Sequence, residues 1–234
     1  MSIVDIIILI FLALGAVAGF KAGVIKKLTD FVGTLVVIFL SFYLKNYLSV
    51  IMYENLPFFN FGGKIKGIEV LNILIYEVVA FVIVFSLLLL ILKLLLMITG
   101  VIEKILKATI ILSIPSKLIG IVVGTVEMYV YVFAVLVILS LPLFSNNFLK
   151  DSKVADFMLN KTPILSEKVD EVLELYDDVY NIIDTRKEKT NEEVNTEATK
   201  VLLDKEAVTK SSIKKLVNKN KLHLSDNRII EEED

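Results

Sequence analysis

Four long runs of apolar residues constrain the fold of this sequence more than any other feature. They lie at about residues 3–20, 31–44, 70–92 and 118–144. The second run extends to Val50 if the Lys45 side chain reaches the membrane surface. A helix needs about 20 mostly apolar residues to cross the hydrocarbon core of a bilayer. The sequence therefore predicts an all-α membrane protein, a helical bundle of four spans.

Small residues repeat along one face of the first span and again at the start of the fourth. The positions are Gly15, Ala18, Gly19, Ala22 and Gly23 in the first span, and Gly120 and Gly124 in the fourth. Lipid gives no hydrophobic drive for two helices to associate, so small residues mark where backbones approach closely. We expect the first span to pack against the second or the fourth. Self-association through this face is the alternative.

Two stretches between the runs interrupt the pattern. Residues 45–69 are irregular, and their aromatic residues around Pro57 and the Gly62–Gly63 pair are typical of a membrane interface. Residues 94–114 carry apolar residues on one helical face and charges on another, which predicts a helix lying in the interface and ended by Pro115. The alternative is that the third span simply continues into water.

The membrane pattern stops near residue 144 and a polar tail follows. Residues 1–144 carry 10 lysines and 7 acidic residues, whereas residues 145–234 carry 15 basic and 20 acidic residues. This change predicts two domains, a transmembrane domain (1–144) and a partly helical tail (145–234).

Within the tail the periodicity predicts one long amphipathic helix over residues 164–183, with Thr162 as its N-cap and Pro163 at its first position. Residues 186–199 are charged and predict a linker. One or two short helices are expected in residues 201–224, and the acidic end is expected to be disordered.

Residue types that catalysis requires are scarce. The chain has no cysteine, which excludes disulfides and thiolate metal sites, and its single histidine, His223, lies in the polar tail. No nucleophile, zinc or phosphate-loop motif is present. No basic stripe with interleaved aromatic residues is present either, so nucleic acid is not an expected partner. We therefore expect a protein that is not an enzyme, needs no metal or cofactor, and has the lipid bilayer as its main partner.

Charged residues inside the apolar runs are the remaining chemical feature. Asp5 and Lys93 lie at span ends, whereas Glu77 lies about two turns inside its span and Glu127 is the deepest. An ionisable group within a span is costly unless it is paired or hydrated, so it is a functional hypothesis. One interpretation of Glu127 is a hydrogen bond to Tyr43, Thr34 or Ser41 on a neighbouring helix. The other is a proton or cation site.

The distribution of lysines in the short loops predicts the orientation. The first turn holds Lys21, Lys26 and Lys27, and the third connection holds Lys104, Lys107 and Lys117. Basic loops stay on the cytoplasmic side, which favours an extracytoplasmic N-terminus and tail. The second loop also carries lysines, which leaves the opposite orientation open. No basic residue precedes the first span, which argues against a cleaved signal peptide.

One pattern near the start resembles a known family. Asp5 is followed by Gly15, Gly19, Phe20 and Gly23, and the fourth span opens with Gly120 and Gly124. This order and spacing, over about residues 1–144, resembles the colicin V production protein (CvpA) family. The chain departs from the family pattern at Met128, where a third small residue is expected, and at Glu127, where the family often has a basic residue.

The resemblance implies a four-span bacterial protein of the cytoplasmic membrane. It implies a role in producing or exporting a peptide toxin and in envelope homeostasis. With the small-residue faces, it leads us to expect that the protein assembles with itself or with other envelope proteins, the latter through the tail. Two other hypotheses stay open from the residues alone. One is a small channel or transporter that uses Glu127, and the other is a sensor or anchor whose tail binds an envelope protein.

Overall fold

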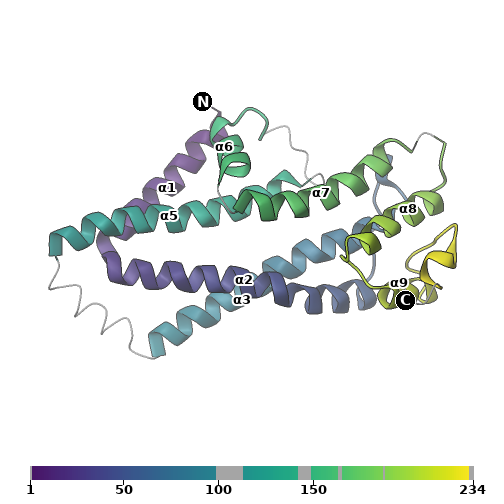
Figure 1. The fold of residues 1–234 in the computed structure, drawn as a ribbon, viewed down its shortest axis with the longest axis horizontal. Helices are drawn as coiled ribbons and strands as arrows, with labels where there is room; N and C mark the ends of the chain where they lie inside the picture. Colours follow the sequence, from purple (N-terminus) through teal and green to yellow (C-terminus); the bar gives the residue numbers. More distant parts are fainter. Residues whose placement is uncertain (1, 99–112, 142–148, 163–164, 187, 232–234) are drawn as a thin grey trace. The chain divides into compact units, whose positions relative to one another are not determined.

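The structure is a computed structural model that describes residues 2–98, 113–141, 149–162, 165–186 and 188–231 (Figure 1). All regular secondary structure in these residues is helical, which confirms the predicted fold class. Four α-helices are long and apolar enough to cross a membrane. They are α1 (Ile3–Ala22), α2 (Val24–Asn55), α3 (Leu71–Ile98) and α5 (Ser113–Ser140). Four spans were predicted, and four are found.

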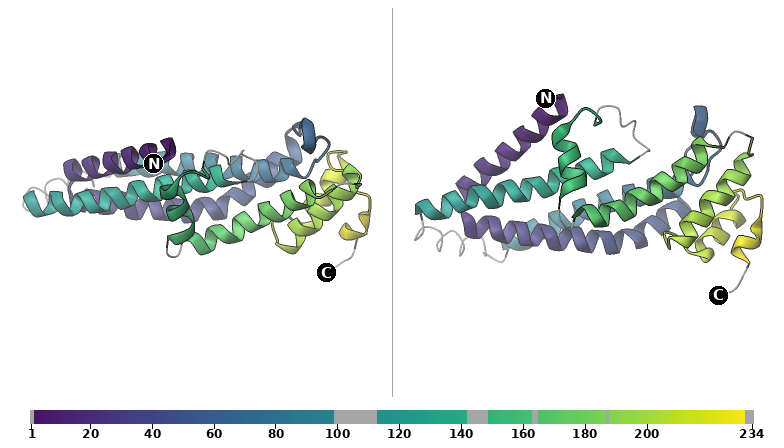
Figure 2. Two further views of the ribbon diagram at one scale, coloured as in Figure 1. Left: turned by 90° about the horizontal axis from the view of Figure 1, so that it is seen from above. Right: turned by 45° about the horizontal axis from the view of Figure 1, so that its top comes forward.

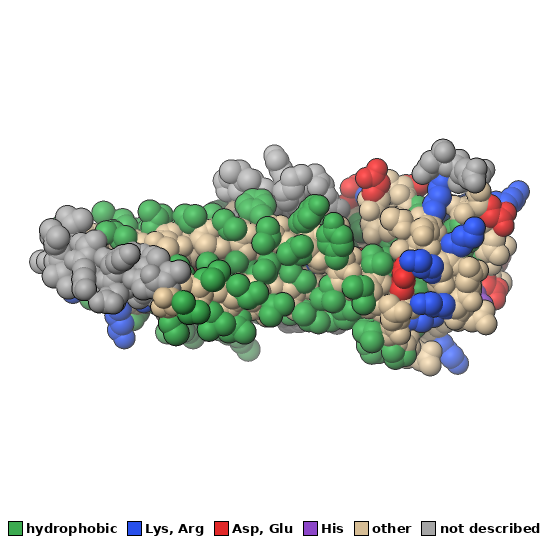
Figure 3. All heavy atoms as spheres, turned by 90° about the horizontal axis from the view of Figure 1, so that it is seen from below, with side chains coloured by type: hydrophobic (Ala, Val, Ile, Leu, Met, Phe, Trp, Pro, Cys, Tyr) green, Lys and Arg blue, Asp and Glu red, His purple; other side chains and the backbone are tan. Residues whose placement is uncertain are grey.

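Exposed apolar side chains show how these helices meet their surroundings. Large hydrophobic residues on all four are more than a third exposed, for example Phe11, Phe39, Leu87 and Val122. Hydrophobic side chains accordingly form a broad band on the face drawn in Figure 3. Water would oppose such a surface, whereas lipid matches it, so these helices are membrane spans.

The first and second spans are separated by a single residue. Gly23 ends α1 with φ 77° and ψ 166°, a left-handed conformation that glycine adopts without the steric cost of a Cβ. Its N–H donates to the Gly19 carbonyl, and α2 begins at the next residue. The predicted basic turn is therefore partly helical, because Lys21 lies in α1 and Lys27 in α2.

The irregular stretch predicted from residue 45 begins later than expected. α2 continues to Asn55, so Tyr47 and Tyr53 are helical residues. The loop proper runs from Leu56 to Val70 and contains the short 3-10 helix η1 (Gly63–Ile65). Phe59 and Tyr76 pack as tilted rings 5.8 Å apart, and the Tyr76 hydroxyl donates to the Pro57 carbonyl.

The predicted interfacial helix over residues 94–114 is wrong at both ends. Residues 94–98 continue α3, and residues 113–114 already belong to α5. Pro115 does not end a helix: it lies in the first turn of α5, where the missing N–H of proline would have no intrahelical partner. Residues 99–112, the middle of the predicted element, lie outside the described residues.

The chain divides into two compact units that interleave in sequence. The first comprises Met1–Tyr43 and Ile83–Glu167, and the second comprises Leu44–Val82 and Lys168–Asp234. In the first unit α1 packs against α5, and the right-hand view of Figure 2 shows the two helices meeting at one end and diverging toward the other. The domain boundary predicted at residue 144 divides the chain by polarity instead of by contacts, and it stays a prediction.

The tail is more helical than the sequence predicted. It contains α6 (Lys153–Lys161), α7 (Leu165–Asp184), α8 (Asn191–Asp204), α9 (Lys210–Asn218) and the 3-10 helix η3 (Asn227–Ile230). Thr162 is the C-cap of α6 and not the N-cap of α7. The linker predicted over residues 186–199 is wrong from Asn191 onward. A capping box between Thr190 and Glu193 starts α8. Val194, Ala198 and Leu202 form its inner face and are fully buried.

Contacts within each unit agree with an even number of spans. In the first unit, residues just after α5 bond Asp5 at the start of α1. In the second unit, Asn195 of α8 accepts hydrogen bonds from the backbone of Glu69 and Val70 in the α2–α3 loop. Among the described residues, two candidate spans, α3 and α5, separate that loop from the tail, which agrees with both being on one side of the bilayer.

Candidate functional site

The glycines of α1 and α5 lie directly against each other in the first unit. A Cβ added to Gly19 would collide with the Gly120 carbonyl oxygen, and one added to Gly15 would lie 2.5 Å from that of Gly124. Conversely, a Cβ added to Gly120 would collide with the Gly19 carbonyl oxygen, and one added to Gly124 would collide with that of Gly15. The two backbones therefore touch in antiparallel order, as small residues at four-residue spacing allow.

The other predicted small residues take different positions. Gly23 lies beside Gly120 at the end of α1, and the Val24 N–H next to it donates to Ser116 Oγ of α5 at 3.2 Å. Ala22 is half-buried, whereas Ala18 is exposed. The contact therefore follows the narrow i, i+4, i+8 line of Gly15, Gly19 and Gly23, and Ala18 falls to one side of it.

Glu127 is paired with a lysine from the next helix. Lys27 Nζ of α2 donates to Glu127 Oε2 of α5 at 2.5 Å, and both side chains are largely buried, 14% and 9% exposed. Two of the predicted partners bond elsewhere: the Thr34 hydroxyl shares a 2.8 Å hydrogen bond with Tyr131, and Ser41 donates to the Val37 carbonyl. Sequence reasoning placed Lys27 in a loop, so it missed this pair.

Lys27 reaches Glu127 because of how its helix begins. The Val24–Ser116 contact places the start of α2 near the start of α5, and Lys27 lies one turn further along α2. A lysine stem is long enough to carry its ammonium several ångströms along an apolar surface. Pairing each charge with the other offsets much of the cost of burying either one in a span.

Glu77 is held by a second set of polar groups in the second unit. It accepts hydrogen bonds from Lys45 Nζ and from Ser49 Oγ, which lie one turn apart on α2. The sequence left open whether the Lys45 side chain reaches the membrane surface. In the structure Lys45 and Glu77 form an ion pair, with side chains 23% and 12% exposed.

Asp5 is a buried polar residue whose role the sequence did not predict. Its Oδ1 accepts hydrogen bonds from Ser152 Oγ at 2.6 Å and from the Val154 N–H at 3.1 Å. Its Oδ2 accepts from the Ser2 N–H at 2.8 Å, which completes a capping box at the start of α1. One carboxylate thus serves the first turns of both α1 and α6, and it fixes where the tail begins.

Away from the glycine contact, α1 and α5 diverge and leave an apolar pocket of about 340 Å³. Its lining includes Ile7 and Phe11 of α1 and Val132 and Val135 of α5. Asp5, Glu77 and Glu127, which the sequence singled out, each have a polar partner and do not line this pocket. The arrangement is therefore suited to closing and holding helices, and it presents no constellation of nucleophile, base and oxyanion donors among the described residues.

The profile of the family described as Colicin V production protein matches residues 4–163. The chain belongs to this family. The resemblance drawn from Asp5 and the glycines is therefore confirmed. The matched residues cover all four spans and α6, and they end before α7.

One curated relative of this member of the Colicin V production protein family is an "Uncharacterized transmembrane protein YshB" of Bacillus subtilis (strain 168). It is 30% identical over 179 residues, which is 74% of this chain and 98% of the relative. No solved structure matches the chain. The family and this relative support a multi-pass membrane protein.

Proposed function

We propose that this protein is a non-enzymatic component of the bacterial cytoplasmic membrane that supports the production or export of a colicin V-type peptide toxin and envelope homeostasis. The observation that carries the proposal is the family match over residues 4–163, which includes every span. The fold agrees with a structural role, because the intramembrane charges Glu127 and Glu77 are paired with Lys27 and Lys45.

The tail is the proposed site of assembly with other envelope proteins. The glycine face of α1 is already occupied by α5, so it is not free to hold a second copy of the chain. The tail helices α7 to α9 instead expose polar and charged surface outside the spans. We therefore assign partner binding to the tail and helix closure to the glycines.

A gene deletion tests this proposal. The deletion strain should retain toxin inside the cell, or become sensitive to envelope stress such as bile salts or detergent, and the wild-type gene on a plasmid should reverse the defect. A plasmid that carries the Gly62→Ala variant should reverse the defect equally well, because a Cβ at Gly62 meets no atom within 4 Å. Unchanged toxin release and unchanged envelope resistance in the deletion strain would refute the proposal.

A small channel or transporter is the second candidate. The observation that favours it is the Lys27–Glu127 pair, which places two titratable groups inside a span. Purified protein in liposomes should then carry a proton or cation flux that Glu127→Gln changes. A flux no greater than that of empty liposomes would remove this candidate and leave the first untouched.

We also propose that the tail lies outside the cytoplasm. The chain contains no cysteine, so a single Ser211→Cys substitution supplies a unique labelling site at an exposed position. An impermeant maleimide should label this cysteine in intact cells. Labelling only after the cells are broken would show that the tail lies in the cytoplasm and would refute this orientation.

A further inference from the structure

Basic residues are segregated within one segment of the tail. Residues 207–225 contain five lysines, Lys210, Lys214, Lys215, Lys219 and Lys221, and no acidic residue. The rest of the tail, residues 145–206 and 226–234, carries 10 basic and 20 acidic residues. The segment lies beyond the residues that match the family, so its charge needs an explanation of its own.

The fold turns this segment into a helix with a buried face and a cationic face. Ile213 and Leu216 of α9 are fully buried, whereas Lys214, Lys215 and Lys219 are exposed. Thr209 caps the helix through the Ser212 N–H. The apolar side of α9 is therefore used for packing within the second unit, and Lys214, Lys215 and Lys219 lie on its exposed side.

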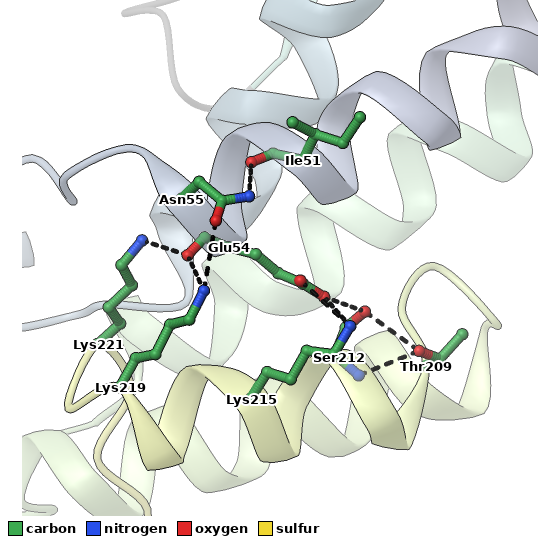
Figure 4. A network of polar contacts seen from close by, with 8 residues as sticks. All are labelled: Ile51, Glu54, Asn55, Thr209, Ser212, Lys215, Lys219 and Lys221. Atoms are coloured by element: carbon green, nitrogen blue, oxygen red, sulfur yellow. Dashed lines mark hydrogen bonds and ion pairs between the residues drawn. The ribbon is translucent and has the colours of Figure 1, made fainter.

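Polar contacts fasten α9 to the end of a membrane span (Figure 4). Glu54, near the end of α2, accepts hydrogen bonds from Ser212 Oγ and from Lys215 Nζ, both at 3.2 Å. Lys219 Nζ and Lys221 Nζ donate to the Glu54 main-chain carbonyl at 3.0 and 2.8 Å. These lysines meet carbonyl groups that the helix itself leaves unpaired, and their charge suits the negative end of the helix dipole.

Exposed apolar side chains surround the same helix end. Ile51 lies one turn before Glu54 and is 59% exposed, and Leu56 just after it is 42% exposed. In the α2–α3 loop Phe59 is 55% exposed, and Lys221 Nζ lies 5.4 Å from the centre of the Phe58 ring. Aliphatic and aromatic groups at the end of a span are typical of the boundary between hydrocarbon and headgroups.

We propose that the lysine-rich segment 207–225 binds the headgroups of anionic phospholipids in the bilayer that the protein spans. Lysine clusters next to the end of a span recognise anionic lipid in this way. The neighbouring exposed apolar side chains favour a lipid surface over a soluble acidic protein, because they mark the level of the membrane interface, where headgroups lie. This surface is independent of the proposed function in toxin production.

Lipid titration of the full-length protein tests the proposal. The Ser211→Cys protein, in a neutral detergent, carries an environment-sensitive dye and is titrated with phosphatidylglycerol. A matched series uses phosphatidylcholine with the same acyl chains. The dye should respond saturably to phosphatidylglycerol only, and added salt should weaken the response by screening. Lys214→Gln should raise the midpoint about fivefold, and Lys214→Glu, which changes the charge by two, about 25-fold.

Matched variants separate binding from misfolding. Lys200→Gln removes an exposed charge from α8, outside the segment, and should leave the midpoint unchanged. Thermal unfolding of every variant should stay near that of the parent. Equal responses to both lipids, an unchanged midpoint in the Lys214→Glu variant, or a response to an acidic polypeptide but not to phosphatidylglycerol would each overturn the proposal.

Discussion

Lys27 Nζ lies 2.5 Å from Glu127 Oε2, so two side chains a hundred residues apart form an ion pair within the spanning helices. The pair connects α2 to α5, and the glycine contact connects α1 to the same α5. The fourth span is therefore the helix against which the first two are fixed.

Breaking this pair should destabilise the bundle more than removing it altogether. Glu127→Leu or Lys27→Met leaves one buried charge without its partner, which costs about 3 kcal/mol in unfolding free energy. The double variant Lys27→Met with Glu127→Leu should recover most of the loss. Unfolding in detergent micelles, arranged as a double-mutant cycle, measures both effects. Additive losses would show that the two residues do not interact.

The glycine contact should not tolerate a single added methyl group. Gly19→Ala places a Cβ against the Gly120 carbonyl, which is backbone and cannot rotate away, so a loss of about 2 kcal/mol is expected. Gly33→Ala is the matched control within a span, because its Cβ meets the flexible end of the Leu92 side chain. Thermal unfolding should fall clearly for Gly19→Ala and little for Gly33→Ala. Equal losses would contradict the close backbone approach.

Loss of the Asp5 carboxylate should loosen the start of α6. Asp5→Ala removes the acceptor for Ser152 Oγ and for the Val154 N–H, while Ser152→Ala removes the N-cap of α6. Hydrogen exchange at the Val154 and Ala155 amides should accelerate in both variants. Amides in the middle of α8, which belongs to the second unit, provide the internal reference. An unchanged exchange rate at the Val154 amide in Asp5→Ala would argue against a role of Asp5 in capping α6.

Lys205 should make the packing of α7 and α8 sensitive to high pH. Hydrogen bonds from Lys205 to Glu174 and to Asp178 raise its pKa above the ordinary 10.5. Because the folded-state pKa is raised, the stabilisation is complete below pH 10.5 and is lost as pH rises through the folded value. An NMR titration of Lys205 should show the upward shift. Glu174→Gln with Asp178→Asn should return the pKa toward 10.5.

Several features could be predicted because each depends on a local stretch of chain. The four spans follow from the length of the apolar runs, and the family follows from Asp5 and the glycine spacing. Element boundaries were less predictable. α2 continues past Lys45 because Glu77 neutralises that lysine, and α8 forms in a charged stretch because three apolar residues find a core.

Partners of the buried polar groups could not be predicted from spacing. Lys27, Asp5 and Glu54 each pair with a residue about 100 or more positions away, and no local pattern indicates which one. The sequence by itself thus determined that the chain crosses a membrane on four helices and where small residues permit close contact. Only the tertiary structure decided which helix fills the glycine face and which charges neutralise each other. The physical reason is that hydrophobic length is a property of one segment, whereas pairing depends on atoms from two segments meeting at hydrogen-bonding distance.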